Sequence, residues 1–339
     1  MTGTEARAKQ EHRTGVSHWS ACLAVFVAVT ATAAPGPPDG STPEQKAIIA
    51  ADPAYVPQRL GLVVAGTHPA RRRSLFNGKK LDGWDSWLGA PDPGQTYAPV
   101  PFRPIGLNND KTHVFSVVKE DGAPVIFSNG KVFGGLITRK AYSNYHLHIE
   151  YKWGQHAWIP DFPRNNGVLY HSHGPYGAFF GSWMQAIEFE IVPHSVGMLL
   201  TVGQSKTPGS FSDVAWNVGA VVPVGQDAGL KYPQRRYMLG GRPVPVVVPA
   251  YNVEGATDAE KPLGQWNALD LYVFGDRSIH VVNGVPVMAA TNLSTVDSSG
   301  KRRPLTRGRI QLQSEGAETF FRNITIEPIS ALPRIRDAR

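Results

Sequence analysis

The chain has 339 residues, of which 42% are hydrophobic and 18% are charged, and its formal net charge is +7. This is the composition of a globular protein, in which 35 Gly and 28 Pro favour turns over long helices, and the length allows one large β domain or two ordinary ones. No basic stripe runs through a recognisable nucleic-acid module, so we expect no nucleic-acid partner. Binding to an anionic surface of another partner is an alternative.

An apolar run at 21–29 contains the single cysteine, Cys22. The run has the length of a signal-peptide hydrophobic region and is too short to span a bilayer, and the small residues at 31–34 suit signal peptidase. We therefore expect a signal peptide over 1–34 and a secreted or periplasmic protein. After cleavage it would have no cysteine and no stable membrane span. An uncleaved anchor and a buried core segment are the alternatives.

Residues 35–72 are rich in Pro, Ala, Gly and short polar residues, which predicts a linker or pro-segment. A short helix over 41–50, with a Pro in its first turn, is compatible with this stretch. The main domain is expected to span 73–330.

Short alternating segments dominate the domain, and the Asn-Gly pairs between them are turn signals because both residues tolerate positive φ. A Pro/Gly-rich stretch at 89–109 is too long for a hairpin loop and predicts a surface excursion or a lid. No segment shows sustained helical periodicity, so the pattern predicts an all-β fold, a two-sheet antiparallel β-sandwich or jelly roll. The expected strands are 114–118, 125–127, 134–139, 142–153, 266–274, 309–314, 320–326 and a hairpin at 278–287.

A stretch at 193–265, rich in Gly, Pro and Val, interrupts this succession of strands. Its X-Pro pairs predict an irregular insertion. Because it follows the strand at 186–191, we expect it to contribute to the rim of any site there.

Two neighbouring segments, 165–173 and 186–191, carry the best candidate site. An Asn-Asn-Gly turn is expected to lead into a strand with His171 and His173, and the next strand carries Glu188 and Glu190. Residues two apart in a strand point the same way, so each pair should share one face, opposite apolar neighbours. The alternative is that these four groups are simply the solvated face of a sheet.

The ordered set of motifs resembles the DUF1080 family, also called the 3-keto-disaccharide hydrolase family. The similar pieces run from Leu75-Phe76-Asn77-Gly78 to the strand at 321–326, and the resemblance covers roughly 73–328. It implies a concanavalin-like jelly roll in an exported protein that acts on oxidised glycosides. The chain departs from the family at Asn166, where Ser is common, at Glu190, where Gln is common, and in its long insertion.

The resemblance implies cleavage of a 3-keto glycoside, in which a base removes the C2 proton and the C1 substituent leaves by elimination. Such a site needs a base, a donor at the ketone oxygen and an acid for the leaving group. Glu188 is the expected base, because a carboxylate that is partly buried beside a like charge has a raised pKa. The expected proton shuttles or enolate contacts are His171 and His173, and the expected substrate-binding residues are Arg139, Asn166, Trp183, Glu190 and Gln313.

The sequence also allows a metal-dependent reaction and other classes of function. No cofactor is expected, although a divalent metal on His171, His173, Glu188 and Glu190 would suit an enolate. An ordinary endoglucanase of this fold would carry a third acid after Glu190, and Ile191-Val192-Pro193 stands there instead. A non-catalytic, lectin-like carbohydrate-binding module and a surface-assembly module are the other classes. Elsewhere, we expect Glu150 to form a cross-strand ion pair rather than to act in catalysis.

Overall fold

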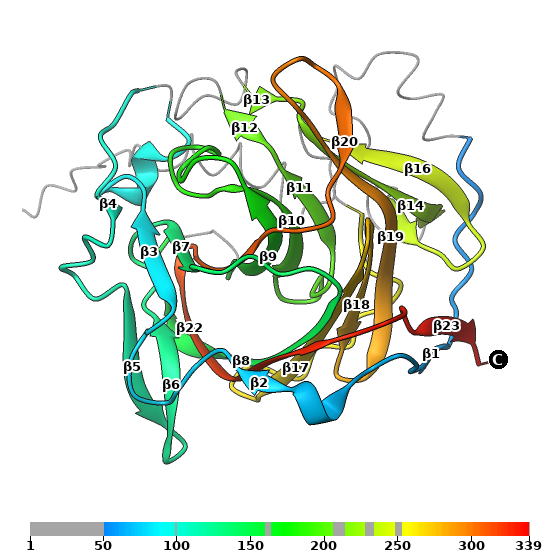
Figure 1. The fold of residues 1–339 in the computed structure, drawn as a ribbon, viewed down its shortest axis with the longest axis horizontal. Helices are drawn as coiled ribbons and strands as arrows, with labels where there is room; N and C mark the ends of the chain where they lie inside the picture. The colour runs from blue at the N-terminus through cyan, green and yellow to red at the C-terminus, as the bar shows by residue number, and fades with distance from the viewer. Residues whose placement is uncertain are drawn as a thin grey trace, which may run out of the picture.

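Two antiparallel sheets pack against each other across one apolar core (Figure 1). The computed structural model describes residues 51–98, 100–159, 164–205, 214–227, 234–247 and 253–338. The predicted signal peptide and the predicted helix at 41–50 lie outside the described residues. The prediction of an all-β, two-sheet sandwich is confirmed.

The smaller sheet has seven strands in the order β11-β10-β9-β21-β7-β3-β4. Its strands are β3 (Trp84–Leu88), β4 (Gly106–Leu107), β7 (Gly134–Thr138), β9 (Asn166–His173), β10 (Gln185–Ile191), β11 (Leu199–Val202) and β21 (Arg309–Ser314).

The larger sheet has twelve strands, nine of them in the order β15-β14-β19-β18-β17-β8-β22-β6-β5, with β16, β2 and β20 paired to β14, β22 and β19. Their bounds are β2 (Arg73–Ser74), β5 (Phe115–Glu120), β6 (Ala123–Ser128), β8 (Tyr145–Ala157), β14 (Val218–Asp227), β15 (Gln234–Tyr237), β16 (Arg242–Val247), β17 (Asn267–Phe274), β18 (Arg277–Val282), β19 (Val285–Val296), β20 (Arg302–Pro304) and β22 (Ala317–Pro328).

Four further strands and two short 3-10 helices lie outside these sheets. They are β1 (Leu60–Val63) paired with β23 (Arg334–Asp337), β12 (Gln204–Ser205) paired with β13 (Val214–Ala215), η1 (Pro69–Arg71) and η2 (Pro93–Gln95).

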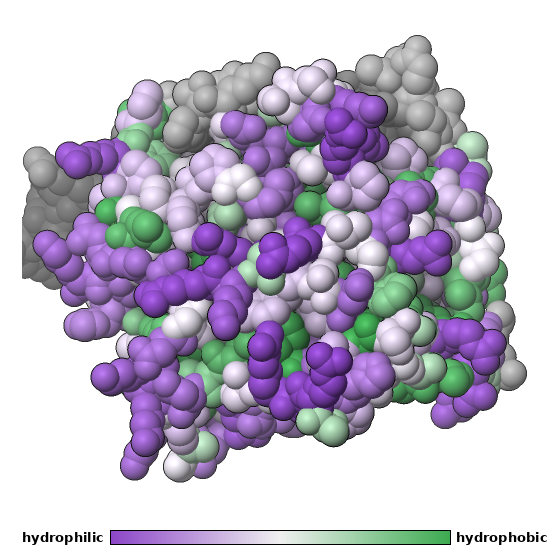
Figure 2. Space-filling view, in the orientation of Figure 1, coloured by the Kyte–Doolittle hydropathy of each residue, from purple (hydrophilic) through white to green (hydrophobic). Residues whose placement is uncertain are grey.

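Alternation of apolar and polar residues along the strands determines which side chains face the core. In β8, Leu147 and Ile149 are buried in the main cluster, whereas His148 and Glu150, which alternate with them, are partly exposed on the other face. The β18–β19 hairpin turns on Asn283 (φ 49°) and Gly284 (φ 83°), as its Asn-Gly pair predicts. The face seen in Figure 1 is mainly polar, with apolar side chains in small separate patches (Figure 2).

Residues 51–72, which we expected in the linker, lie against the domain. Leu60 is buried in the main core cluster, and β1 pairs with β23 near the other end of the chain. The carboxylate of Asp52 is fully buried and forms ion pairs with Arg235 (2.7 Å) and with Arg242. The chain is therefore already packed on the domain from about residue 52.

The insertion at 193–265 is more regular than its composition predicts. β11 extends the smaller sheet, while β14 continues the larger sheet by pairing with β19. Among the described residues, β16 is paired on one side only, to β14. It therefore tolerates Pro243 and Pro245, whose missing N–H groups can face the unpaired side.

Candidate functional site

The candidate carboxylates lie on the face of the smaller sheet that points away from the sandwich core, called the outer face below. In β10, Ile187, Phe189 and Ile191 pack in the core cluster. Glu188 and Glu190 alternate with them and therefore lie together on the outer face, as expected. Both side chains are buried, so the alternative that they simply belong to the solvated face of a sheet is wrong for these two residues.

Strand pairing aligns the Glu188 carboxylate with polar residues of two other strands, β21 and β3. Glu188 pairs with Leu169, which pairs with Gln311. Gln311 in turn pairs with Ile137, which pairs with Asp85 of β3. Paired residues share a face, so one row crosses the outer face from Glu188 to Asp85.

Gly167 gives Glu188 and Gln313 the space they occupy. It lies inside β9 rather than in the turn that Asn165-Asn166-Gly167 predicted. A Cβ atom on Gly167 would lie 2.2 Å from Glu188 Oε1 and 2.5 Å from Gln313 Oε1. The glycine is therefore needed for close approach of side chains, not for a positive φ.

Glu188, Glu190 and Glu315 form a buried acidic cluster, to which Tyr97 donates a hydrogen bond at Glu315 Oε1 (3.1 Å). Burial raises the pKa of Glu188 to about 8, against a hydrogen bond with Gln313 that lowers it. Burial and the neighbouring Glu188 carboxylate raise the pKa of Glu190 well above its ordinary value. These carboxyl groups therefore retain protons near neutral pH, which gives the cluster the capacity for acid–base chemistry.

Aromatic side chains cover the cluster. Tyr97, from the 89–109 stretch, contacts Phe133 and Phe180 with ring centroids 5.9 and 5.1 Å apart. Trp183 stacks on Phe133 and donates its indole N–H to the Gly134 carbonyl oxygen (2.9 Å). Trp183 is only 2% exposed, so it is part of this cover rather than an open platform for a sugar ring.

The same face carries a more exposed polar group around Asp85. Its carboxylate accepts hydrogen bonds from Arg139 (2.9 Å), Asn108 (3.0 Å) and Tyr176 (3.2 Å). Burial raises the pKa of Asp85, but these hydrogen bonds outweigh it and lower the pKa below its ordinary value. Arg309 donates to the Tyr176 hydroxyl. This end of the outer face offers two guanidinium groups and an aromatic ring.

The two histidines of β9 do not join Glu188. β9 carries a bulge at which His171 has a φ of 53°. The Nε2 atom of His173 lies 2.9 Å from the hydroxyl of Thr295 in β19, so this ring reaches toward the larger sheet. His171 is fully buried, and burial lowers its pKa to about 3. Among the described contacts, neither ring touches Glu188.

Asn166 also points into the sandwich. Its side-chain amide donates to the hydroxyl of Thr319 in β22 (2.9 Å), and its Oδ1 accepts from the Gly167 backbone N–H (2.8 Å). The structure thus brings together Glu188, Glu190 and Gln313, places Arg139 on the same face, and keeps Asn166 apart from them.

Sequence reasoning missed several members of this face, chiefly Asp85, Tyr176, Arg309 and Glu315. A signal for Arg309 was present, because it alternates with buried Ile310 in the strand that also carries Gln313. Tyr176 and Glu315 lie beyond strand ends, where alternation gives no information.

Within the described ranges, the His, Cys, Asp and Glu side chains form no group of three or more placed to hold a metal ion. The same part of the chain contains no helix that is both long and apolar enough to cross a membrane.

Among solved structures, a presumed glycosyl hydrolase of Parabacteroides distasonis is 18% identical with a TM-score of 0.41, and the match covers 77% of this chain and 95% of that one. A β-glucanase of Bacillus licheniformis is 9% identical with a TM-score of 0.36, covering 78% and 99%. A carbohydrate-binding module of Bacillus subtilis is 10% identical with a TM-score of 0.33, covering 63% and 91%.

No curated protein matches the chain. One family model does, the 3-keto-alpha-glucoside-1,2-lyase-like domain, and it spans residues 71–327. That span runs from the last residue of η1 to Glu327 in β22 and contains every residue of the outer face described above. The chain therefore belongs to the 3-keto-alpha-glucoside-1,2-lyase-like domain family.

Proposed function

We propose that this protein cleaves 3-keto glycosides by proton abstraction and elimination at the outer face of the smaller sheet. The base removes the C2 proton, and the electron pair left behind is delocalised onto the C3 ketone oxygen as an enolate. The enolate then expels the C1 substituent, which takes up a proton, and a C1=C2 double bond forms. Water adds to that bond in a later step.

Glu188 is the proposed base, and the observation that carries this assignment is its environment. Glu188 is 4% exposed, and its carboxyl group lies against Gly167 and has an Oε1 atom without a hydrogen-bond partner among the described residues. A carboxylate held this way is a stronger base than one in water, because burial disfavours its charged form. Burial is what keeps that pKa high, and the Glu188 charge in turn raises the pKa of the neighbouring Glu190.

Arg139 and Arg309 are the proposed contacts for the enolate oxygen. Both lie on the outer face, and guanidinium groups donate charge-assisted hydrogen bonds to oxyanions. Since Tyr97 and its aromatic neighbours cover Glu188, the proposal requires the Tyr97 side chain to move before a sugar ring can contact the carboxyl group.

The test is turnover of 3-keto glucosides beside their unoxidised parent glucosides. We expect cleavage of the 3-keto compounds alone, with a rate that rises with pH toward about 8 as Glu188 loses its proton. Glu188→Gln should lower kcat by a factor of at least about 100. Asn166→Ser, which changes a residue on the other face of β9, is the matched control and should retain most of the activity.

Cleavage of the parent glucosides alone would exclude the elimination mechanism, and an active Glu188→Gln variant would exclude Glu188 as the base. Binding of sugars without any cleavage would indicate a carbohydrate-binding module instead. Export is also part of the proposal, supported by the apolar run at 21–29 and the small residues after it. An intact N-terminus on the protein recovered from the native cell envelope or medium would exclude cleavage near residue 34.

A further inference from the structure

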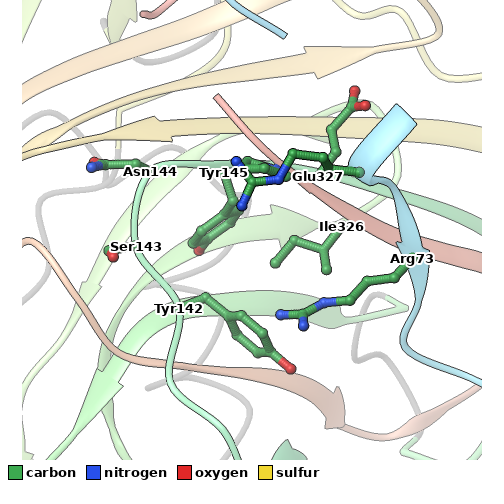
Figure 3. A pocket seen from close by; sticks show the side chains of 9 residues that line it. Arg73, Tyr142, Ser143, Asn144, Tyr145, Ile326 and Glu327 are labelled. Carbon is green, nitrogen blue, oxygen red and sulfur yellow. The ribbon is translucent and has the colours of Figure 1, made fainter. Parts of the chain in front are cut away.

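A pocket lined by two arginines lies at the edge of the sandwich, away from the acidic cluster. Its volume is about 330 Å³, and it is formed by η1 and β2, the loop between β7 and β8, and the end of β22. Figure 3 shows its side chains: Arg73 extends toward the ring of Tyr142, with Ile326 beside them. The Arg73 guanidinium lies 5.5 Å from the centre of the Tyr142 ring.

Two arginines of the pocket carry uncompensated charge. Arg71 and Arg73 line it and are exposed, and neither has an acidic partner among the described residues. Arg72 between them differs, because it is paired with Glu327 (3.1 Å). Stacking on Tyr142 holds Arg73 in place without neutralising it, so its N–H donors stay available.

The rest of the wall supplies neutral donors. Tyr145 is only 2% exposed, and its buried hydroxyl has no hydrogen-bond partner among the described residues. Burial raises the pKa of Tyr142, so its hydroxyl remains a donor at neutral pH. Asn144 uses its Oδ1 to accept from the Gly275 backbone N–H (2.8 Å), and Ser143 adds a hydroxyl. An unpaired donor in a buried site normally marks a missing acceptor.

The single carboxylate in the pocket wall belongs to Glu327, whose Oε1 is paired with side chains outside the pocket and whose Oε2 has no hydrogen-bond partner among the described residues. Its Oε1 lies within hydrogen-bonding distance of Arg72 (3.1 Å) and of His146 Nδ1 (2.8 Å). Ile326 and Glu327 point to opposite faces of β22, and Figure 3 shows the Glu327 carboxylate turned away from Arg73 and Tyr142. The pocket interior therefore combines excess positive charge with hydrogen-bond donors.

We propose that this pocket binds a small oxyanion, meaning a sulfate, a phosphate or a carboxylate group, between Arg71 and Arg73 with Tyr142 as a neutral donor. Guanidinium groups match the geometry of such groups, and the pocket is large enough for the anion and a small part of the molecule that carries it. The site is separate from the outer face and does not depend on the proposed glycoside chemistry.

The test is isothermal titration calorimetry of the full-length protein with sodium sulfate, phosphate and glucuronate at low ionic strength, with glucose as the uncharged reference. We expect one site per chain for at least one of the three anions, and the tightest of them identifies the group. Arg71→Gln with Arg73→Gln should weaken binding about tenfold or more, and added salt should weaken it as well.

The matched control is Arg277→Gln with Arg334→Gln, which removes the same charge from two exposed arginines outside the pocket. It should leave the affinity unchanged within about twofold. If both double variants bind the anion equally weakly, the effect is a general charge attraction, and the proposal is overturned. Glucose binding that is lost with the pocket arginines, or absence of anion binding, would also overturn it.

Tyr142→Phe provides a second test that keeps the ring under Arg73 and removes one donor. We expect it to weaken anion binding several-fold while the melting temperature stays near that of the native protein. If the double arginine variant does not fold, Tyr142→Phe tests the proposal together with the position of selenate in an anomalous map from crystals of the native protein. Selenate away from Arg71 and Arg73 would contradict the proposal.

Discussion

At the scale of single residues, the close packing around Gly167 controls the position of Glu188. The carboxyl group of Glu188 and the amide of Gln313 both lie over the glycine, in space that any other side chain would occupy. A local pattern cannot reveal this, because the residue that needs the space is in another strand. The Asn-Gly pair therefore predicted a turn, whereas the glycine serves a contact between β9 and β10.

Replacing Gly167 with Ala should displace both side chains. The added Cβ would lie 2.2 Å from Glu188 Oε1, so we expect a loss of about 1–3 kcal/mol in the free energy of unfolding and a marked fall in any Glu188-dependent activity. Chemical denaturation and turnover measure the two effects. Gly61→Ala in β1, whose nearest neighbour would be 3.6 Å away, is the matched control. Equal effects of the two substitutions would contradict the steric explanation.

The histidines show another limit at this scale. Alternation predicted that His171 and His173 share a face, but the bulge in β9 interrupts the period of two. Bulges depend on the partner strand: here Gly308 is the residue that allows the approach, since a Cβ on it would lie 2.2 Å from the His171 carbonyl carbon. That information is more than a hundred residues away in the chain.

At the scale of elements, an ionic network ties three strands of the larger sheet together. Asp270 of β17 lies between His146 Nε2 (2.7 Å) and His148 Nδ1 (2.8 Å) of β8, and His146 also contacts Glu327 of β22. Glu150 forms the cross-strand ion pair that we expected, with Arg322 at 2.6 Å. Alternation therefore predicted which residues of β8 form its polar face. Their partners on β17 and β22 could not be predicted without the strand order.

Asp270→Asn should destabilise the protein more at pH 6 than at pH 9. The hydrogen bond to Asp270 raises the pKa of His148 above 6.5, so the stabilisation is fully present below about 6.5 and is lost as the pH rises through the folded-state pKa. Burial raises the pKa of Asp270, but hydrogen bonds from the two histidines outweigh it and lower the pKa to about 2, so Asp270 is ionised throughout this range. We expect a loss of about 1–3 kcal/mol at pH 6.

Urea denaturation at the two pH values measures this difference. The control is Asp276→Asn. Asp276 lies on the β17–β18 turn and has no ion pair among the described residues, so this substitution should have the same small effect on stability at both pH values. A larger loss for Asp270→Asn at pH 9 than at pH 6 would show that His148 does not carry the pH dependence.

At the scale of the whole molecule, the two-sheet architecture followed from alternation and turns alone. Nearly every expected strand is present, because one face of each must be buried and the period of two is therefore strongly selected. The strand order and the contribution of the insertion were not predictable, since β14 and β16 contain prolines that weaken the strand pattern locally while edge pairing tolerates them. The candidate site stays a prediction: alternation placed Glu188 and Glu190 on one face of β10, but finding their neighbours on β3 and β21 required the strand order of the smaller sheet.

The N-terminal boundary of the domain gives the last prediction. Compared with a chain that begins at Ala51, a chain that begins at Arg73 loses β1 and leaves Arg235 and Arg242 without the buried carboxylate of Asp52. Because breaking a buried ion pair costs about 3–5 kcal/mol, we expect the shorter chain to lose at least about that much stability. Asp52→Asn in the longer chain separates the ion pairs from the strand pairing. If both chains unfold at the same denaturant concentration, residues 51–72 are a linker after all, and the domain is complete from Arg73 onward.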